Sequence, residues 1–204
     1  MSTWTFKTVV AAAVFALSAC DGTLPMSRNA TEAVRLPSGV VVEGSRGWCV
    51  ARDMLRTDEA ASVVVFGSCA AITKEAAPDP SDVPGVITVS VDNTASGTAP
   101  ADVLDAYFAT ERGRAALARD GRAESVRILE TRQSGDALFL HAIDRSGVPF
   151  NAAEDYWRAI FDLGGRFVTV SLVGLADDPI DRATGLRTLQ AQVNRIRAAN
   201  PETG

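Results

Sequence analysis

Residues 125–174 decide the fold, and they read SVRILETRQSGDALFLHAIDRSGVPFNAAEDYWRAIFDLGGRFVTVSLVG. Two turn signals interrupt this stretch: Gln133-Ser134-Gly135 offers a glycine for a left-handed position, and Gly164-Gly165 suits a two-residue hairpin turn. The segments around these turns are rich in apolar and β-branched residues and are the expected strands: Ser125–Arg132, Asp136–Asp144, Asp155–Leu163 and Arg166–Gly174. Four consecutive strands with short connections predict an antiparallel meander.

The last of these strands alternates valine or leucine with threonine or serine. Successive side chains of a strand point to opposite faces, so this pattern predicts a half-buried strand. Three upstream segments have a similar composition and are also expected to be strands: residues 40–42, 62–66 and 86–91. Residues 74–85 contain three prolines and are typical of a loop.

A helix is expected at residues 102–119. Pro100 suits its first turn, Asp102 favours the positive end of the helix dipole, and Gly121 can end it. Apolar residues at helical spacing give it one apolar face: Val103, Leu104, Tyr107 and Phe108. Gly113 lowers the helix propensity in the middle, which favours a break near this position.

A second helix is expected at residues 178–199. Asp178 is its expected N-cap, Pro179 suits the first helical position, and Asn200-Pro201 ends it. Its apolar stripe is expected to face the sheet: Leu186, Leu189, Val193 and Ile196. Arg182 and Arg187 are assigned to its solvated side.

These elements predict an α+β fold, in which an antiparallel sheet packs with one inserted helix and one C-terminal helix. Residues 36–204 are expected to form this single domain. The order of early strands, helix, meander and closing helix loosely resembles the PsbP-like fold of extrinsic photosystem II proteins. The resemblance implies a fold and no activity, because a fold does not determine function.

The N-terminus has the pattern of a secretory signal, since Lys7 is followed by an uncharged run to Ala16 and then by small residues. The run is too short to span a bilayer, which takes about 20 apolar residues. The segment Leu17-Ser18-Ala19-Cys20 resembles the lipobox of bacterial lipoproteins. The resemblance implies that residues 1–19 are removed and that the thiol of Cys20 carries diacylglycerol. An ordinary cleaved signal is the alternative.

A lipid on Cys20 would hold the protein in the bacterial envelope, at a membrane that faces the periplasm. Two or three acyl chains anchor a protein stably, because each buried methylene contributes about 0.8 kcal/mol. Asp21 resembles the inner-membrane retention signal of enterobacterial lipoproteins. That signal differs between bacterial groups, so the outer membrane is the alternative location. Residues 20–35 lack a sustained period and are expected to form a tether.

The chain has 204 residues, a formal net charge of -5 and a sequence pI of about 4.9. This balance argues against a nucleic-acid-binding protein, which needs a basic surface to neutralise phosphates. One histidine and three cysteines offer little material for a zinc site, and we expect neither a metal nor an organic cofactor. Export favours a structural disulfide between Cys49 and Cys69, with a reactive thiol as the alternative.

Candidate catalytic and metal-binding residues are few. His141 could act as a general base, although a single histidine on a strand is more often structural. A hydrolase of the Ser-His-Asp type would depend on this residue. Asp177, Asp178 and Asp181 could offer oxygen ligands to calcium, but helix capping explains two of the three.

Two further groups of residues are interpreted from their local sequence. Asp79 and Asp82 are interpreted as turn residues. Tyr156 and Trp157 are neighbours on an expected strand, so one should point into the core, and the other is a candidate for an exposed aromatic beside Arg158 at a partner surface.

We therefore expect a non-catalytic, lipid-anchored envelope protein that acts as an accessory or assembly module for another envelope component. The expected partners are a membrane and a protein, and not a nucleic acid. The alternative is a carrier or sensor that holds a small apolar ligand between the sheet and a helix. A hydrolase that depends on His141 is the third hypothesis.

Overall fold

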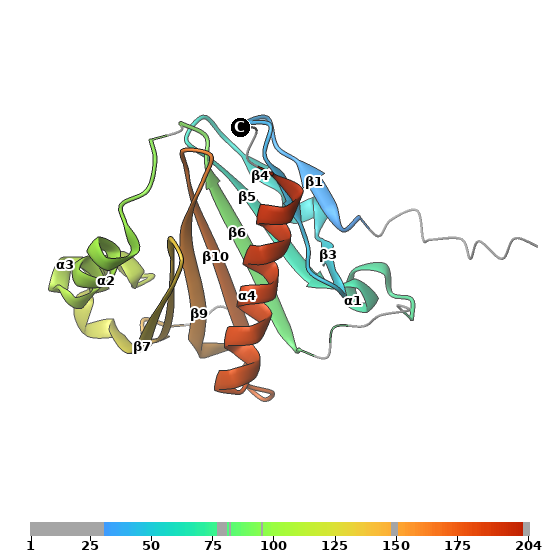
Figure 1. Cartoon of the computed structure of the whole chain (residues 1–204). Helices are drawn as coiled ribbons and strands as arrows, with labels where there is room; N and C mark the ends of the chain where they lie inside the picture. Colours follow the sequence, from blue (N-terminus) through green and yellow to red (C-terminus); the bar gives the residue numbers. More distant parts are fainter. Residues whose placement is uncertain (1–30, 77–80, 82, 95, 148–150, 202–204) are drawn as a thin grey trace, which may run out of the picture.

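The computed structural model describes residues 31–76, 81, 83–94, 96–147 and 151–201. Their centre is an eight-stranded antiparallel sheet with the order β3-β5-β6-β10-β9-β8-β7, in which β4 also pairs with β5. The strands are β3 (Trp48–Val50), β4 (Arg56–Thr57), β5 (Ala61–Ser68), β6 (Gly85–Asp92), β7 (Val126–Ser134), β8 (Ala137–Asp144), β9 (Ala152–Leu163) and β10 (Arg166–Leu175). The predicted α+β class is confirmed (Figure 1).

The predicted meander is present, because β7, β8, β9 and β10 are neighbours in the sheet. Gly164 and Gly165 form its last turn, with φ values of 59° and 80° that favour glycine. The first turn differs from the prediction: Ser134 pairs with Ala137, so the ladder runs further than expected and the turn has two residues. The connection between β8 and β9 is also longer than a tight turn.

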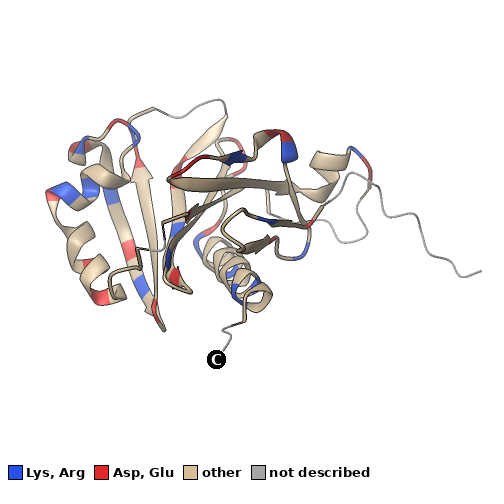
Figure 2. Ribbon diagram, turned by 90° about the horizontal axis from the view of Figure 1, so that it is seen from above, with Lys and Arg blue, Asp and Glu red and all other residues tan. Residues whose placement is uncertain are grey.

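Helices lie on both faces of the sheet. Helix α4 (Arg182–Ala199) runs along one face, and the pair α2 (Ala101–Ala109) and α3 (Glu111–Leu117) lies on the other face at one end (Figures 1 and 2). The predicted stripe of α4 is confirmed, because Leu189, Val193 and Ile196 are buried and Leu186 is half-buried. On the opposite face, residues of α2 and α3 form a second core with residues of β8 and β9.

The helix expected at residues 102–119 is in fact two helices. Thr110 separates them, and its side chain accepts a hydrogen bond of 3.0 Å from the N–H of Gly113. The backbones of α2 and α3 approach so closely at this corner that a Cβ atom on Gly113 would lie 2.0 Å from the carbonyl oxygen of Tyr107. Gly121 lies in a later turn with a φ of 72°, so the expectation that it ends the helix is wrong.

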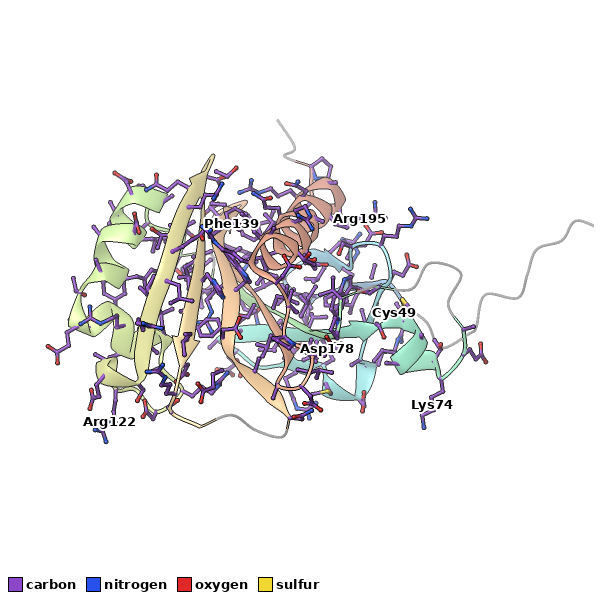
Figure 3. The ribbon with its side chains drawn as sticks, turned by 90° about the horizontal axis from the view of Figure 1, so that it is seen from below. Cys49, Lys74, Arg122, Phe139, Asp178 and Arg195 are labelled. Atoms are coloured by element: carbon purple, nitrogen blue, oxygen red, sulfur yellow. A yellow bond between two sulfur atoms is a disulfide. The ribbon has the colours of Figure 1, made fainter. Side chains whose placement is uncertain are left out.

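Helix α4 begins later than expected, because its N-cap is Asp181 and not Asp178. The carboxylate of Asp181 accepts hydrogen bonds of 3.0 and 3.1 Å from the N–H groups of Ala183 and Thr184. Asp178 lies in the preceding loop (Figure 3). This loop brings Ile180 against the core, next to Gly85 and Gly174, which explains the delayed start of the helix.

A short hairpin of β1 (Ala33–Arg35) and β2 (Val41–Glu43) packs on α4. The side chain of Asn200 accepts a hydrogen bond from the N–H of Val41 and donates one to its carbonyl oxygen, at 2.9 and 2.7 Å. Because β1 is part of the fold, the prediction that the tether extends to residue 35 is wrong at its C-terminal end. The remaining elements are η1 (Arg52–Met54), α1 (Cys69–Thr73) and η2 (Ala123–Ser125).

Candidate functional site

Some of the predicted site residues lie outside the described part of the chain. These are the signal segment with Cys20 and Asp21, and the loop residues Asp79 and Asp82.

Of the acidic residues before α4, Asp181 acts as the helix cap, and hydrogen bonds from Thr184 and Ala183 lower the pKa of its carboxyl. The interpretation that capping also uses Asp178 is wrong, since the helix begins only after Asp181.

Cys49 and Cys69 form the expected disulfide, which connects β3 to the start of α1. The S–S distance is 2.01 Å and the Cα–Cα distance is 4.7 Å. Both cysteines are buried, and Figure 3 shows Cys49 near the β1–β2 hairpin. The carboxylate of Glu32 lies within 4.8 Å of both sulfur atoms. In the disulfide neither sulfur is a thiolate, which is the form that binds metals.

The only histidine of the chain is held between two residues of β9. The ring of His141 stacks on Trp157 with 4.5 Å between the centroids and 7° between the planes. Its Nε2 atom lies 3.1 Å from Oδ2 of Asp155. The histidine is 8% exposed. A nucleophile in contact with this base would be needed for hydrolysis, and no serine, threonine or cysteine among the described residues forms a hydrogen bond with it.

A charged cluster beside His141 was not predicted from the sequence. Glu130 lies opposite His141 in the register of β7 and β8, after an irregularity in the pairing between Ile128 and Glu130. Its carboxylate pairs with Arg132, at 3.3 Å, and with Arg182 at the start of α4. The cluster connects the edge strand to the helix. A local shift in register decides which side chains meet here, and composition does not reveal such a shift.

A cavity of about 360 Å³ lies between the start of α2 and the turn that joins β7 to β8. Three carboxylates are part of its lining: Asp102, Asp136 and Asp162. Asp136 pairs with Arg197 at 2.5 Å, and Asp162 accepts a hydrogen bond of 2.8 Å from the N–H of Gly165. Three carboxylates give this cavity a negative charge, which does not favour an apolar ligand.

The sheet face opposite α4 is covered only in part, because α2 and α3 contact chiefly β7 and β8. Over β5, β6 and β10, cross-strand rows of small side chains lie outside the chief contacts of α2 and α3, while α1 and η1 contact β5. We call this surface the open face, and it consists of Val63, Val65, Thr88, Ser90, Arg158, Phe167, Thr169, Ser171 and Val173. With the exception of Val65, which is buried, these residues are half-buried. Phe167 and Val173 also contact the second core, so they form the border of the open face.

Arg158 lies at the border between the open face and the layer of α2 and α3. Its Nε atom donates a hydrogen bond of 3.0 Å to Oγ of Ser171. The guanidinium carbon lies 5.1 Å from the ring centroid of Tyr156. No carboxylate of the described residues forms an ion pair with Arg158, which therefore presents an unpaired positive charge on this face.

The expectation of one exposed aromatic beside Arg158 is wrong. Tyr156 and Trp157 are 4% and 2% exposed, because helices cover β9 on both faces at this level. The hydroxyl of Tyr156 donates a hydrogen bond of 3.3 Å to the carbonyl oxygen of Leu117, and burial raises its pKa. The partly exposed residue next to them is Arg158.

Comparison with models of known protein families found no match, and comparison with curated proteins found none either. None of the helices in the described part of the chain has the length and the apolar character that a membrane span requires. Basic and acidic residues are interspersed over the described elements (Figure 2).

Proposed function

We propose that this chain is a lipid-anchored envelope protein that binds another envelope component through the open face, without catalysis of its own. The observation that carries the proposal is that α2 and α3 pack chiefly on β7 and β8 and leave the rows of β5, β6 and β10 on this face outside their main contacts. A sheet in a domain normally buries a face with apolar residues against another layer. The valines and Phe167 of the open face offer such a surface to a partner.

The N-terminal sequence supports the location. The lipobox-like segment that ends at Cys20 implies a lipid anchor, and a disulfide suits an exported protein in an oxidising compartment. Strand β1 begins at Ala33, so only a short segment of sequence separates the proposed lipid from the domain. The domain would thus work close to the membrane surface, where a partner in the envelope can reach it.

The candidate catalytic groups favour binding over catalysis. The ring of His141 is stacked on Trp157 and pairs with Asp155, which positions these side chains inside the layer beneath α4. Cys49 and Cys69 are used by the disulfide. A catalytic group has to reach a substrate, and these residues serve the packing of the fold.

Copurification from gently solubilised native membranes tests the proposal. We expect a C-terminally tagged chain to retain a partner at near-stoichiometric amounts. Thr169→Trp, which adds bulk to the open face, should lose that partner, and Arg187→Glu on the exposed side of α4 should keep it. Equal retention by both folded variants would contradict the assignment of the open face.

The lipid anchor has its own test. Cys20→Ser should move the protein from the membrane fraction to the soluble fraction, because the acyl chains have no other attachment point in the lipobox-like segment. Ser18→Ala is the matched control, since it changes the same segment and keeps the thiol. Membrane residence of the Cys20→Ser variant would refute lipid anchoring.

A further inference from the structure

We propose that the open face recognises an acidic, extended segment of a partner protein, and that Arg158 binds a carboxylate of that segment. This inference rests on the proposed function and names the chemistry of the partner. It is carried by three observations: the orientation of Arg158, its lack of an ion pair in the described residues, and the absence of acidic side chains from the two cross-strand rows beside it.

The direction of the Arg158 side chain follows from the strand. Trp157 and Ala159 belong to the core beneath α4, so Arg158 projects from the opposite face. Its hydrogen bond to Ser171 shows that the side chain leans from β9 toward β10, away from α2 and α3. The guanidinium also contacts the ring of Tyr156. These two contacts favour the observed orientation of the group over the open face before any ligand binds.

The remaining donors of Arg158 are available to a ligand. A guanidinium has five N–H donors, and the structure assigns only the Nε–H, which binds Ser171. The two terminal nitrogens form the fork that matches a carboxylate. Other arginines already have such partners, as in the pairs Arg119–Asp144 and Arg195–Glu43. A partly desolvated guanidinium without a carboxylate is a binding group for an incoming anion.

The surroundings of Arg158 favour an extended peptide. Two cross-strand rows contain hydroxyl side chains, one with Ser90 and Thr169 and the other with Thr88 and Ser171. They can exchange hydrogen bonds with peptide groups, while the valines of β5 offer apolar contacts at the border. The rows include no acidic residue, so a carboxylate approaching Arg158 meets no like charge within them.

Two acidic residues lie at the end of the open face near the β9–β10 turn. Asp92 and Asp162 flank Phe167 there. Asp92 accepts hydrogen bonds from Ser96 and Thr94, which lower its pKa to about 2. Their negative charges repel the carboxylates of the partner segment, so this segment is expected to bind around Arg158 and not at that end of the open face.

Binding of labelled short peptides with graded glutamate content, measured by fluorescence anisotropy on the full-length lipidated chain in detergent, tests the inference. We expect glutamate-containing peptides to bind and their glutamine analogues to bind more weakly. Arg158→Gln should weaken the binding of the acidic peptides by about ten- to a hundredfold, as for a hydrogen bond to a charged group. Arg158→Lys should recover only part of the affinity, because the ammonium lacks the fork.

Arg127→Gln is the matched control, because it removes an equal charge from an exposed position on the edge strand β7. Its affinity should be unchanged. Thermal unfolding of all variants shows whether the fold is retained. Equal affinity for acidic and glutamine peptides, or equal effects of the Arg127 and Arg158 substitutions, would overturn the inference.

The outcomes separate this inference from the proposed function. If the native partner is lost in Thr169→Trp and retained in Arg158→Gln, the open face is the docking surface and its acidic ligand is refuted. If neither substitution releases the partner, both proposals fail. Vesicles of phosphatidylglycerol provide the remaining comparison: binding to vesicles that depends on Arg158, without binding to acidic peptides, would overturn the inference in favour of lipid phosphate.

Discussion

Gly185 of α4 lies directly against Trp157 of β9: a Cβ atom on Gly185 would be only 2.4 Å from both Cδ1 and Nε1 of the indole. The helix closes so tightly on the ring that Nε1 is buried without a hydrogen-bond acceptor. On its other contact the same ring stacks on His141. Trp157 therefore packs between α4 and the histidine on β8.

This contact predicts that Gly185→Ala destabilises the protein. In an isolated helix the substitution would stabilise by about 1 kcal/mol. Here the added methyl group forces the indole or the helix to move, and overpacking of this kind costs about 1 to 3 kcal/mol. Denaturant unfolding should show a lower free energy of unfolding for the variant. The loss should shrink in a Trp157→Leu background, and an increase in stability of the single variant would show that the contact is not tight.

A second prediction concerns Gln192, which is fully buried on α4. Its amide accepts a hydrogen bond from the N–H of Ser45 and donates one to the carbonyl oxygen of Glu43, both at 2.8 Å. Gln192→Ala leaves these two backbone groups without a partner, and we expect a loss of about 1 to 3 kcal/mol in the free energy of unfolding. Asn194 provides the control, because it carries the same amide group at an exposed position of the same helix, and Asn194→Ala should have little effect. Similar losses for both variants would argue against this role of Gln192.

The stability at acidic pH should depend on Asp144. Burial raises the pKa of this carboxyl, but hydrogen bonds from Ser146 and from the N–H of Arg119 outweigh burial, so the pKa is below its usual value of 3.8. A carboxyl with a lowered pKa stabilises the folded state above its unfolded pKa, and this contribution is lost as the pH falls through the folded pKa.

We therefore expect the melting temperature to fall below about pH 4, and the fall to be smaller in Asp144→Asn than in the parent chain. The variant should be less stable at pH 7, because it lacks the charge-assisted hydrogen bonds. Asp53→Asn on the exposed η1 is the control. If the pH profile of Asp144→Asn matches that of the parent chain, Asp144 does not carry the acid sensitivity.

The disulfide should contribute measurably to stability. Cys49 and Cys69 are 20 residues apart, and closing a loop of that size stabilises by about 3 kcal/mol in the chain-entropy model. Reduction, or replacement of both cysteines by alanine, should therefore lower the melting temperature. Cys20→Ser should leave the unfolding of the domain unchanged. An unchanged melting temperature after full reduction would mean that the bridge adds nothing to the fold.

His141→Phe separates the structural role of the histidine from a catalytic one. Phenylalanine keeps a flat ring against Trp157, and it removes the pairing with Asp155. We expect a folded variant that retains the native partner in copurification, with a modest loss of stability. Loss of the partner from a variant with unchanged circular dichroism would assign a functional role to the imidazole.

Strong local patterns made much of the fold predictable. The alternation in residues 166–174 and the stripe that includes Leu189 both describe faces that the structure buries. The start of α4 was missed because Asp178 and Asp181 are both good caps, and the packing of Ile180 against the sheet selects the later one. The short strand β1 was missed because three residues are too few to show a period.

The candidate site was less predictable than the fold. Arg158 stood out only as the neighbour of two aromatic residues, and the sequence does not reveal which part of a sheet face the helices leave uncovered. That depends on the break at Thr110, which confines α2 and α3 to one end of the sheet. The position of Glu130 opposite His141 depends on a shift in register that has no sequence signal of its own.

Site-specific photocrosslinking in native membranes tests the central claim most directly. A photoreactive amino acid is placed at Thr169 on the open face or at Arg187 on the exposed side of α4. We expect one recurrent crosslinked envelope protein from Thr169, formed in lower yield when Arg158 is replaced by glutamine, and none from Arg187. A crosslink to an envelope protein from Arg187 alone would place the interface on the helix side and refute docking at the open face.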